Sequence, residues 1–263
     1  MTDLDDAYAN GAYINGAEAY PQRWSDAAAA FREGLGARAR LGLSYGPSDR
    51  MALDHFMPDG RAKGTLIFVH GGYWLKFDRS YWSHFAAGAL ARGWSVAMPS
   101  YDVCPSVRIA GITQQIAQAV TTVAANTTGP ISLAGHSAGG HLVARMLAPG
   151  MLPDTVRDRV CHVVPISPLS DLAPLLRTSM NADFGMDAAM AHAESPVHQP
   201  APDIPTTVWV GGAERPAFLD QAAWLAEAWG CGHVVTPEEH HFNIIDALAD
   251  PDSDMIRRLT SVL

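Results

Sequence analysis

The sequence predicts one α/β domain over residues 1–263, in which helices cover both faces of a mainly parallel β-sheet. Short continuous apolar runs, such as residues 66–69, have the length and character of strands that are buried on both faces. These runs alternate with segments whose apolar residues recur at helical spacing, as in right-handed crossovers between parallel strands. With 263 residues, 48% of them hydrophobic, the chain is long enough to form one large domain around such a sheet.

The individual elements can be assigned in chain order. Buried strands are expected at 64–70, 95–99, 131–134, 160–166, 206–210 and 233–236. Helices are expected at 81–92, 108–125, 140–147, 217–229, 242–249 and 254–262. Residues 50–56 alternate loosely in hydrophobicity and precede a Pro58-Asp59-Gly60 turn, so we expect them to form a hairpin with 64–70.

Two segments do not fit the alternation of strand and helix. Residues 1–46 contain turn signals and then one helix between Pro21 and Gly36. This N-terminal segment is too small for a core of its own, so we expect it to pack on the domain near the active-site rim. Residues 167–204 form an irregular stretch that is long for a compact domain, and we expect it to be a cap or a substrate wall.

Composition argues against several classes of partner. No run reaches about 18 uninterrupted apolar residues, so no membrane span is expected. The acidic start MTDLDDAY lacks the features of a signal peptide, which favours a cytoplasmic protein. Three scattered cysteines fit neither a disulfide framework nor a zinc site. A net charge of −9 without a Lys/Arg cluster argues against nucleic acid. We expect a small-molecule substrate, with a homodimer left open as an alternative to a monomer.

The strongest motif lies in residues 130–142, PISLAGHSAGGHL. It contains a complete G-x-S-x-G, with a strand-length apolar run before it and helical spacing after it. Strand, sharp turn and helix are the context in which this motif exposes a nucleophilic serine at the top of a sheet. We therefore predict Ser137 as the nucleophile. The alternative is a glycine-rich strand-to-helix turn whose serine has no chemical role.

A nucleophilic serine needs N–H donors for the oxyanion of its tetrahedral intermediate. Ala138 follows the serine, so its backbone N–H is one expected donor. Gly71 and Gly72 end a buried strand, and we expect the second donor there, although a plain turn is the alternative. His70 resembles a general base by residue type, but it precedes the serine, so we expect it to brace the loop.

The acid and the base are expected at the ends of the last two strands. Glu214 follows the strand at 206–210 and is the predicted acid, since carboxyl ends of parallel strands form sites. His241 follows the last strand and begins a helix, so it is the predicted base, ahead of its neighbour His240. The weaker candidates for the acid are Asp220, Asp183 and Asp187. A cluster of His233, Glu238, Glu239, His240 and His241 matches no metal-ligand spacing, so no metal is expected.

Taken together, these motifs resemble the kynurenine formamidase (arylformamidase) branch of the α/β-hydrolases. The resemblance rests on HGGYW at 70–74, SYDVCPSVRIAGITQQIAQAV at 100–120, GHSAGGHL at 135–142, VGGAERPAFLDQA at 210–222 and HFNIID at 241–246. It implies an α/β-hydrolase fold and hydrolysis of N-formyl-L-kynurenine to kynurenine and formate without metal or cofactor. It also implies a Ser137, Glu214 and His241 triad. Many members carry Asp where this chain has Glu214, and Tyr73 replaces the third glycine usual in hormone-sensitive-lipase-like esterases.

The substrate wall and the substrate class are further expectations. A formyl group needs almost no acyl pocket, whereas an aryl leaving group needs a flat apolar wall. The residues expected to provide that wall are Tyr73, Trp74, Phe77, Tyr81, Met180 and Phe184. Two other readings remain open at this point: a short-chain carboxylesterase of broad specificity, and a non-catalytic binding protein with a hydrolase fold. Retention of all three triad residues argues against the second.

Overall fold

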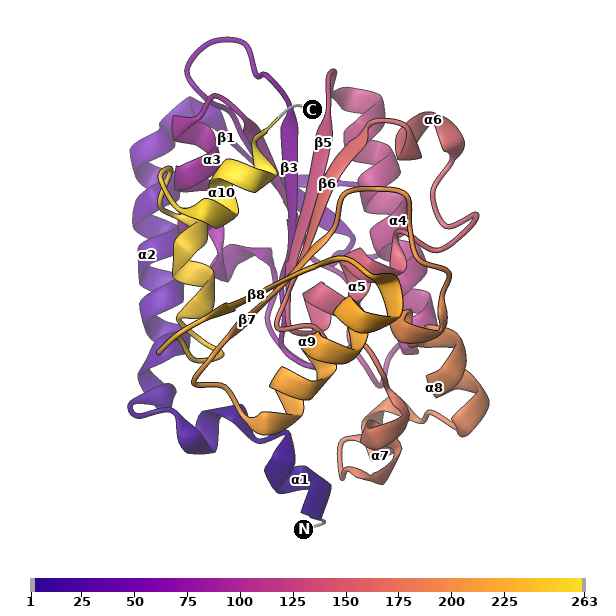
Figure 1. The fold of residues 1–263 in the computed structure, drawn as a ribbon. Coiled ribbons are helices and arrows are strands. Elements are labelled where there is room, and N and C mark those ends of the chain that lie inside the picture. The colour runs from indigo at the N-terminus through magenta and orange to yellow at the C-terminus, as the bar shows by residue number, and fades with distance from the viewer. Residues whose placement is uncertain (1–2, 262–263) are drawn as a thin grey trace.

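The computed structural model describes residues 3–261, and in this part of the chain eight strands form a single sheet (Figure 1). The strands are β1 (Ala39–Ser44), β2 (Ala52–Phe56), β3 (Thr65–Val69), β4 (Ser95–Pro99), β5 (Ile131–His136), β6 (Val160–Ile166), β7 (Thr207–Gly211) and β8 (Gly232–Thr236). Their order across the sheet is β1-β2-β4-β3-β5-β6-β7-β8. Parallel pairing joins the run from β4 to β8, which confirms the expected mainly parallel sheet.

The antiparallel edge of the sheet differs from the expectation. β2 pairs with β1 on one side and with β4 on the other, and both pairings are antiparallel. The expected hairpin between 50–56 and 64–70 is therefore wrong, because β4 lies between β2 and β3. β1 was not expected at all. Nearly all of its residues are exposed, so it carries no pattern of burial.

Helices cover both faces of the sheet. They are α1 (Asp3–Ala7), α2 (Tyr20–Leu35), α3 (Ala87–Ala91), α4 (Ile109–Asn126), α5 (Ala138–Arg145), α6 (Asp154–Arg157), α7 (Asn181–Phe184), α8 (Ala188–Glu194), α9 (Pro216–Trp229) and α10 (Asp254–Leu259). Ile67 and Val69 belong to the core cluster that includes α4, α5 and α9 residues. Leu66 and Phe68 belong to the cluster with residues of α2, α3 and α10. Alternate side chains of β3 thus build two cores, as a strand buried on both faces requires.

Several expected helices are shorter or more irregular than the sequence suggested. The expected helix at 81–92 is divided into the 3₁₀ turns η4 (Arg79–Tyr81) and η5 (Ser83–Ala86), followed by α3. The expected helix at 242–249 is the 3₁₀ turn η8 (Ile244–Leu248). Residues 167–204 contain η6 (Ala173–Arg177), α7, α8 and η7 (Pro196–His198). The N-terminal segment adds η1 (Asn10–Tyr13), η2 (Ala17–Ala19) and η3 (Gly36–Arg38).

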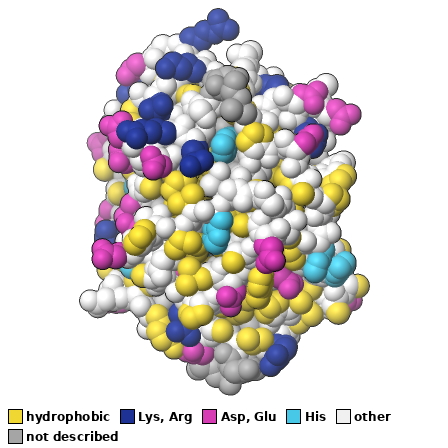
Figure 2. Space-filling model, viewed as in Figure 1, with side chains coloured by type: hydrophobic (Ala, Val, Ile, Leu, Met, Phe, Trp, Pro, Cys, Tyr) yellow, Lys and Arg dark blue, Asp and Glu magenta, His cyan; other side chains and the backbone are white. Residues whose placement is uncertain are grey.

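The surface carries charges of both signs. On the face shown in Figure 2, basic side chains lie interspersed with acidic ones. Among the described residues, no helix combines the length and the apolar character that a membrane span needs.

Candidate active site

The serine of the G-x-S-x-G motif occupies a strained turn between β5 and α5. Ser137 has φ 57° and ψ −118°, a conformation that costs a non-glycine residue about 1–3 kcal/mol. Its N–H donates to the Ile166 carbonyl at 2.8 Å, which ties the turn to β6. A Cβ on Gly135 would overlap the Gly139 carbonyl, and one on Gly139 would overlap the Val69 carbonyl. Both glycines are therefore needed where β3, β5 and α5 meet, and their packing holds the strained serine.

A buried carboxylate and imidazole lie at the same edge of the sheet. Glu214 follows β7, His241 follows β8, and only 7% and 4% of their surfaces are exposed. His241 Nδ1 lies 2.6 Å from Glu214 Oε2. The other carboxylate oxygen, Oε1, accepts the Ser167 hydroxyl at 2.5 Å and the Gly211 N–H at 2.9 Å. The carboxylate is thus held on both oxygens and fixes the orientation of the imidazole.

Ser167 is a residue that the sequence reading missed. It directly follows β6, so it lies at the same carboxyl edge of the sheet as Glu214, and its φ is 46°. A position directly after a buried strand is the one signal that could have identified it. By donating to Glu214, it positions the acid.

Two aromatic rings flank the imidazole of His241. The His136 ring lies 4.6 Å from it and the Phe218 ring 4.4 Å from it, between ring centres. Burial, and then the proximity of His241, lower the pKa of His136 well below its ordinary value, so His136 is neutral at neutral pH. The neighbouring His240 points elsewhere, since its Nε2 lies 3.2 Å from the Tyr20 hydroxyl.

The predicted oxyanion glycines approach the nucleophile closely. A Cβ on Gly71 would lie 2.9 Å from the Ser137 Cβ and 2.8 Å from the His136 carbonyl oxygen. Gly72 has φ 108°, and a Cβ there would lie 2.6 Å from the Lys76 carbonyl oxygen. Only glycine fits at either position. Ala138 is the first residue of α5, where a backbone N–H has no partner inside the helix.

His70 supports this loop and is not placed as a base. Its ring stacks on Tyr101 at 4.4 Å between ring centres, and its Nδ1 lies 2.8 Å from the Gly71 carbonyl oxygen. Burial lowers its pKa to about 4, so the ring is neutral at physiological pH. A neutral ring of this kind donates from Nδ1 to the carbonyl, and this bond orients the peptide next to Ser137.

A cavity of about 710 Å³ opens over Ser137 and His241. Its wall includes three of the six predicted wall residues, namely Tyr73, Phe77 and Met180. The sequence reading missed other members of the wall, among them Tyr8, Asn10, Trp24, Trp82 and Phe242. The wall is largely apolar, so an aromatic group can lie beside the serine.

The other three predicted wall residues do not line this cavity. Trp74 and Phe184 are fully buried and pack edge to face on each other, 5.6 Å between ring centres. Tyr81 packs on Phe77, 5.1 Å between ring centres, outside the lining. The reason lies in the loop: Tyr73 and Trp74 both have positive φ, 54° and 57°, so the chain turns and carries the Trp74 ring into the core.

The N-terminal segment forms one wall of the cavity. We call residues 3–21 the N-terminal strap. The Tyr73 hydroxyl donates to the Tyr8 carbonyl at 2.6 Å, and Arg215 pairs with Asp6 at 2.7 Å. These contacts attach the strap to the loop at 70–77, which carries Gly71 and Gly72 and which we call the oxyanion loop, and to the start of α9.

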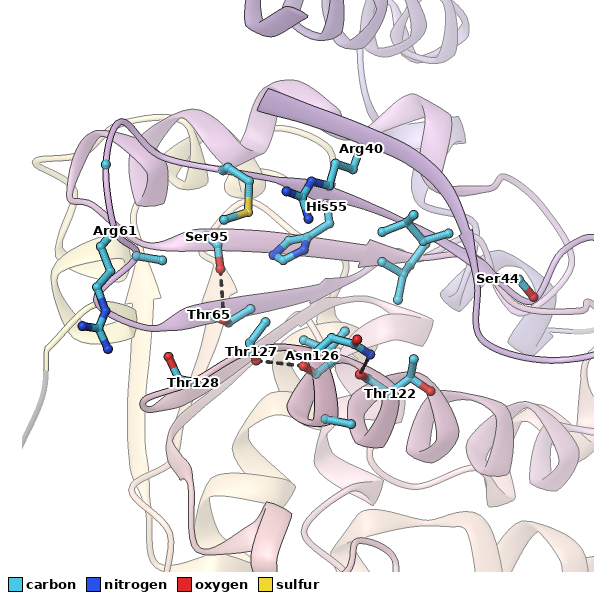
Figure 3. A pocket seen from close by; sticks show the side chains of 17 residues that line it. Arg40, Ser44, His55, Arg61, Thr65, Ser95, Thr122, Asn126, Thr127 and Thr128 are labelled. Carbon is cyan, nitrogen blue, oxygen red and sulfur yellow. Dashed lines mark hydrogen bonds between the residues drawn. The ribbon is translucent and has the colours of Figure 1, made fainter. Parts of the chain in front are cut away.

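A larger cavity, of about 920 Å³, lies elsewhere, between the β1–β2 edge and the end of α4 (Figure 3). Arg40 and His55 are partners across β1 and β2, and their side chains lie side by side in this view. Its lining, all of it described, contains no carboxylate to orient a base and none of the predicted catalytic residues. Within the described residues, no group of three His, Cys, Asp or Glu side chains is placed to hold a metal ion.

Comparisons with known proteins identify the fold family of the chain. A family model described as alpha/beta hydrolase fold matches residues 66–238. Kynurenine formamidase of Salmo salar is 27% identical over 86% of this chain and 83% of its own length, and that of Drosophila melanogaster is 26% identical over 84% and 80%.

Solved structures extend the comparison. A Silicibacter sp. TM1040 protein, to which thioesterase activity is provisionally ascribed, is 62% identical and superposes with a TM-score of 0.98, covering 99% of this chain and 100% of its own. A carbohydrate esterase from gut microbiota, 17% identical, covers 87% of this chain and 99% of its own with a TM-score of 0.69, and therefore shares the fold.

Proposed function

The chain belongs to the alpha/beta hydrolase family and is similar to kynurenine formamidases, and from this premise we propose that it hydrolyses an N-formyl arylamide. N-Formyl-L-kynurenine is the first choice of substrate. The observation that carries the proposal is that His241, which pairs with a doubly held Glu214, lines the same cavity as Ser137.

In the first half of the reaction, His241 Nε2 takes the Ser137 hydroxyl proton as Oγ attacks the formyl carbon. The carbonyl oxygen becomes an oxyanion, which accepts hydrogen bonds from the Ala138 N–H and from the Gly71–Gly72 segment. His241 then gives its proton to the aryl nitrogen, the C–N bond breaks, and the arylamine leaves.

In the second half, water attacks the formyl ester on Ser137, and His241 accepts a proton from that water. The second tetrahedral intermediate collapses, formate departs, and His241 returns the proton to Oγ. Throughout, Glu214 holds the imidazole with Nδ1 protonated and stabilises the imidazolium that forms. Each side chain ends in its starting state.

A second candidate is hydrolysis of short-chain esters or thioesters. The 62%-identical structural relative, with its provisional thioesterase activity, favours this alternative. The chemistry of the serine would be the same, with an alcohol or a thiol replacing the arylamine as leaving group.

A substrate comparison tests both candidates. We would measure kcat/KM for N-formyl-L-kynurenine, N-formylaniline, S-phenyl thioacetate and p-nitrophenyl esters of increasing acyl length. The proposal expects the highest value for N-formyl-L-kynurenine, with ester hydrolysis confined to short acyl groups. A preference for butyryl or longer esters, with no kynurenine released, would contradict the formamidase proposal and favour the esterase alternative.

A further inference from the structure

Three polar side chains in the wall of the catalytic cavity lack partners. Asn10 is only 6% exposed, and both its Nδ2 and its Oδ1 are shielded from solvent without a hydrogen bond. A buried polar group left unpaired costs about 1–3 kcal/mol. Glu18 and Lys76 line the same cavity and are exposed, and neither side chain makes a hydrogen bond or ion pair with any described residue.

These three side chains come from two segments of the cavity wall, the N-terminal strap and the oxyanion loop. Asn10 begins η1 and Glu18 lies in η2, both within the N-terminal strap. Lys76 lies on the oxyanion loop, and its N–H donates to the Gly72 carbonyl at 3.1 Å. The ammonium is therefore carried by a backbone fixed beside the nucleophile, while the carboxylate and the amide are carried by the strap.

We propose that Lys76, Glu18 and Asn10 form a subsite for the α-amino-acid end of the leaving group. The Lys76 ammonium pairs with the substrate carboxylate, and Glu18 pairs with its α-ammonium. The Asn10 amide, which can both donate and accept, turns into the cavity to hold the polar atoms between them. An otherwise apolar cavity with a few converging polar groups orients its ligand by those groups.

This subsite deepens the proposed function. It rests on that function for the formyl group of the substrate, but not for the amino-acid end of the leaving group. Because the subsite acts at a distance from the scissile bond, it positions the substrate and does not take part in the bond changes. Binding energy from this remote part of the substrate then raises kcat as well as lowering KM.

The test uses substrates that differ only in the charged end. N-Formyl-L-kynurenine carries both charges, N-formylkynurenamine lacks the carboxylate, and 2-formamidoacetophenone lacks both. Lys76→Met should lower kcat/KM about 10-fold for the first and leave the other two within about twofold. Glu18→Gln should lower kcat/KM for N-formyl-L-kynurenine and N-formylkynurenamine and leave that for 2-formamidoacetophenone unchanged. Asn10→Leu should lower kcat/KM most for N-formyl-L-kynurenine.

The matched control is Lys63→Met, since the Lys63 ammonium bonds the Arg92 carbonyl outside this cavity. It should leave all three substrates unchanged. Equal losses on all three substrates with Lys76→Met, or no loss on N-formyl-L-kynurenine, would overturn the subsite.

An ester pair separates this proposal from the formamidase proposal. O-Acetyl-L-tyrosine and p-tolyl acetate have similar aryl leaving groups, and only the first carries an α-amino acid. If the wild-type protein released no kynurenine, the formamidase proposal would fail. The subsite would still predict that Lys76→Met lowers kcat/KM for O-acetyl-L-tyrosine relative to p-tolyl acetate, and an unchanged ratio would refute it.

Discussion

Replacing Glu214 with Gln should reverse the tautomer of the catalytic imidazole. In the native site, Oε1 accepts two hydrogen bonds, from the Ser167 hydroxyl and the Gly211 N–H, while Oε2 faces His241 Nδ1. If the new amide nitrogen took the Oε1 position, it would face the Gly211 N–H, donor against donor, at a cost of about 1–3 kcal/mol. The nitrogen therefore takes the Oε2 position and donates to Nδ1. Nε2 then carries the proton and cannot accept one from Ser137.

The expected loss in kcat is on the order of 10³- to 10⁴-fold, as when the acid of a serine triad is made neutral. This corresponds to about 4–5.5 kcal/mol of transition-state stabilisation. Steady-state hydrolysis of p-nitrophenyl acetate measures it, and thermal unfolding checks the fold. Asp220→Asn is the matched control, because Asp220 is an exposed carboxylate on α9. A Glu214→Gln enzyme within about tenfold of wild type would refute the tautomer argument.

Four other outcomes follow from the same geometry. Ser137→Ala should lower kcat by up to about 10⁶-fold without unfolding the protein, and an organophosphate should label Ser137 in the wild type; labelling of another residue would contradict the mechanism. His241→Ala should be nearly as damaging, whereas His240→Ala should be mild because its ring bonds Tyr20; similar losses in both would be the contrary result. Exhaustive EDTA treatment should leave kcat unchanged, and activity restored by added metal would count against a metal-free reaction. Burial lowers the pKa of His70 to about 4. Between pH 6.5 and 4 the unfolded chain therefore binds more protons than the folded protein. The free energy of unfolding consequently falls as the pH falls. The contribution of His70 to the free energy of unfolding falls by about 2 kcal/mol from pH 7 to pH 5. In urea unfolding, the His70→Phe variant should therefore lose about 2 kcal/mol less stability over this pH range than the wild type. An equal loss in the two proteins would contradict this prediction.

The parts of the fold that could be predicted are those whose side chains are buried on both faces. The residues of β3 are all buried, and their continuous apolar run reveals the strand directly. β1 gave no such signal, since Leu41 and Leu43 are exposed at an edge and Gly42 interrupts them. The partner strand of β2 could not be predicted either. A strand in a local hairpin and a strand paired with the distant β4 show the same alternation of side chains, so the pattern does not distinguish them.

The candidate site divides in the same way. Ser137, Glu214 and His241 each follow a strand, so strand order alone brings them to one edge, and the structure does bring them there. The cavity wall depends on loop conformation instead. The positive φ values at Tyr73 and Trp74 decide which of two adjacent rings faces the cavity, and no spacing rule reports them. The strap residues belong to no periodic pattern, so Asn10 could not be identified from the sequence.

The strap also has a consequence for the order in which the site is completed during synthesis. Tyr8 leaves the ribosome early, but Gln221 Nε2, which donates to its hydroxyl at 2.9 Å, lies 213 residues later. At about 5–20 residues per second, roughly 10–40 s pass before this partner is translated. The strap therefore lacks these contacts until late in synthesis, and the cavity is complete only when β7 has joined the sheet and α9 has packed against it. A premature stop after β6 would leave the strap without its Gln221 and Arg215 contacts, in addition to removing the acid and the base.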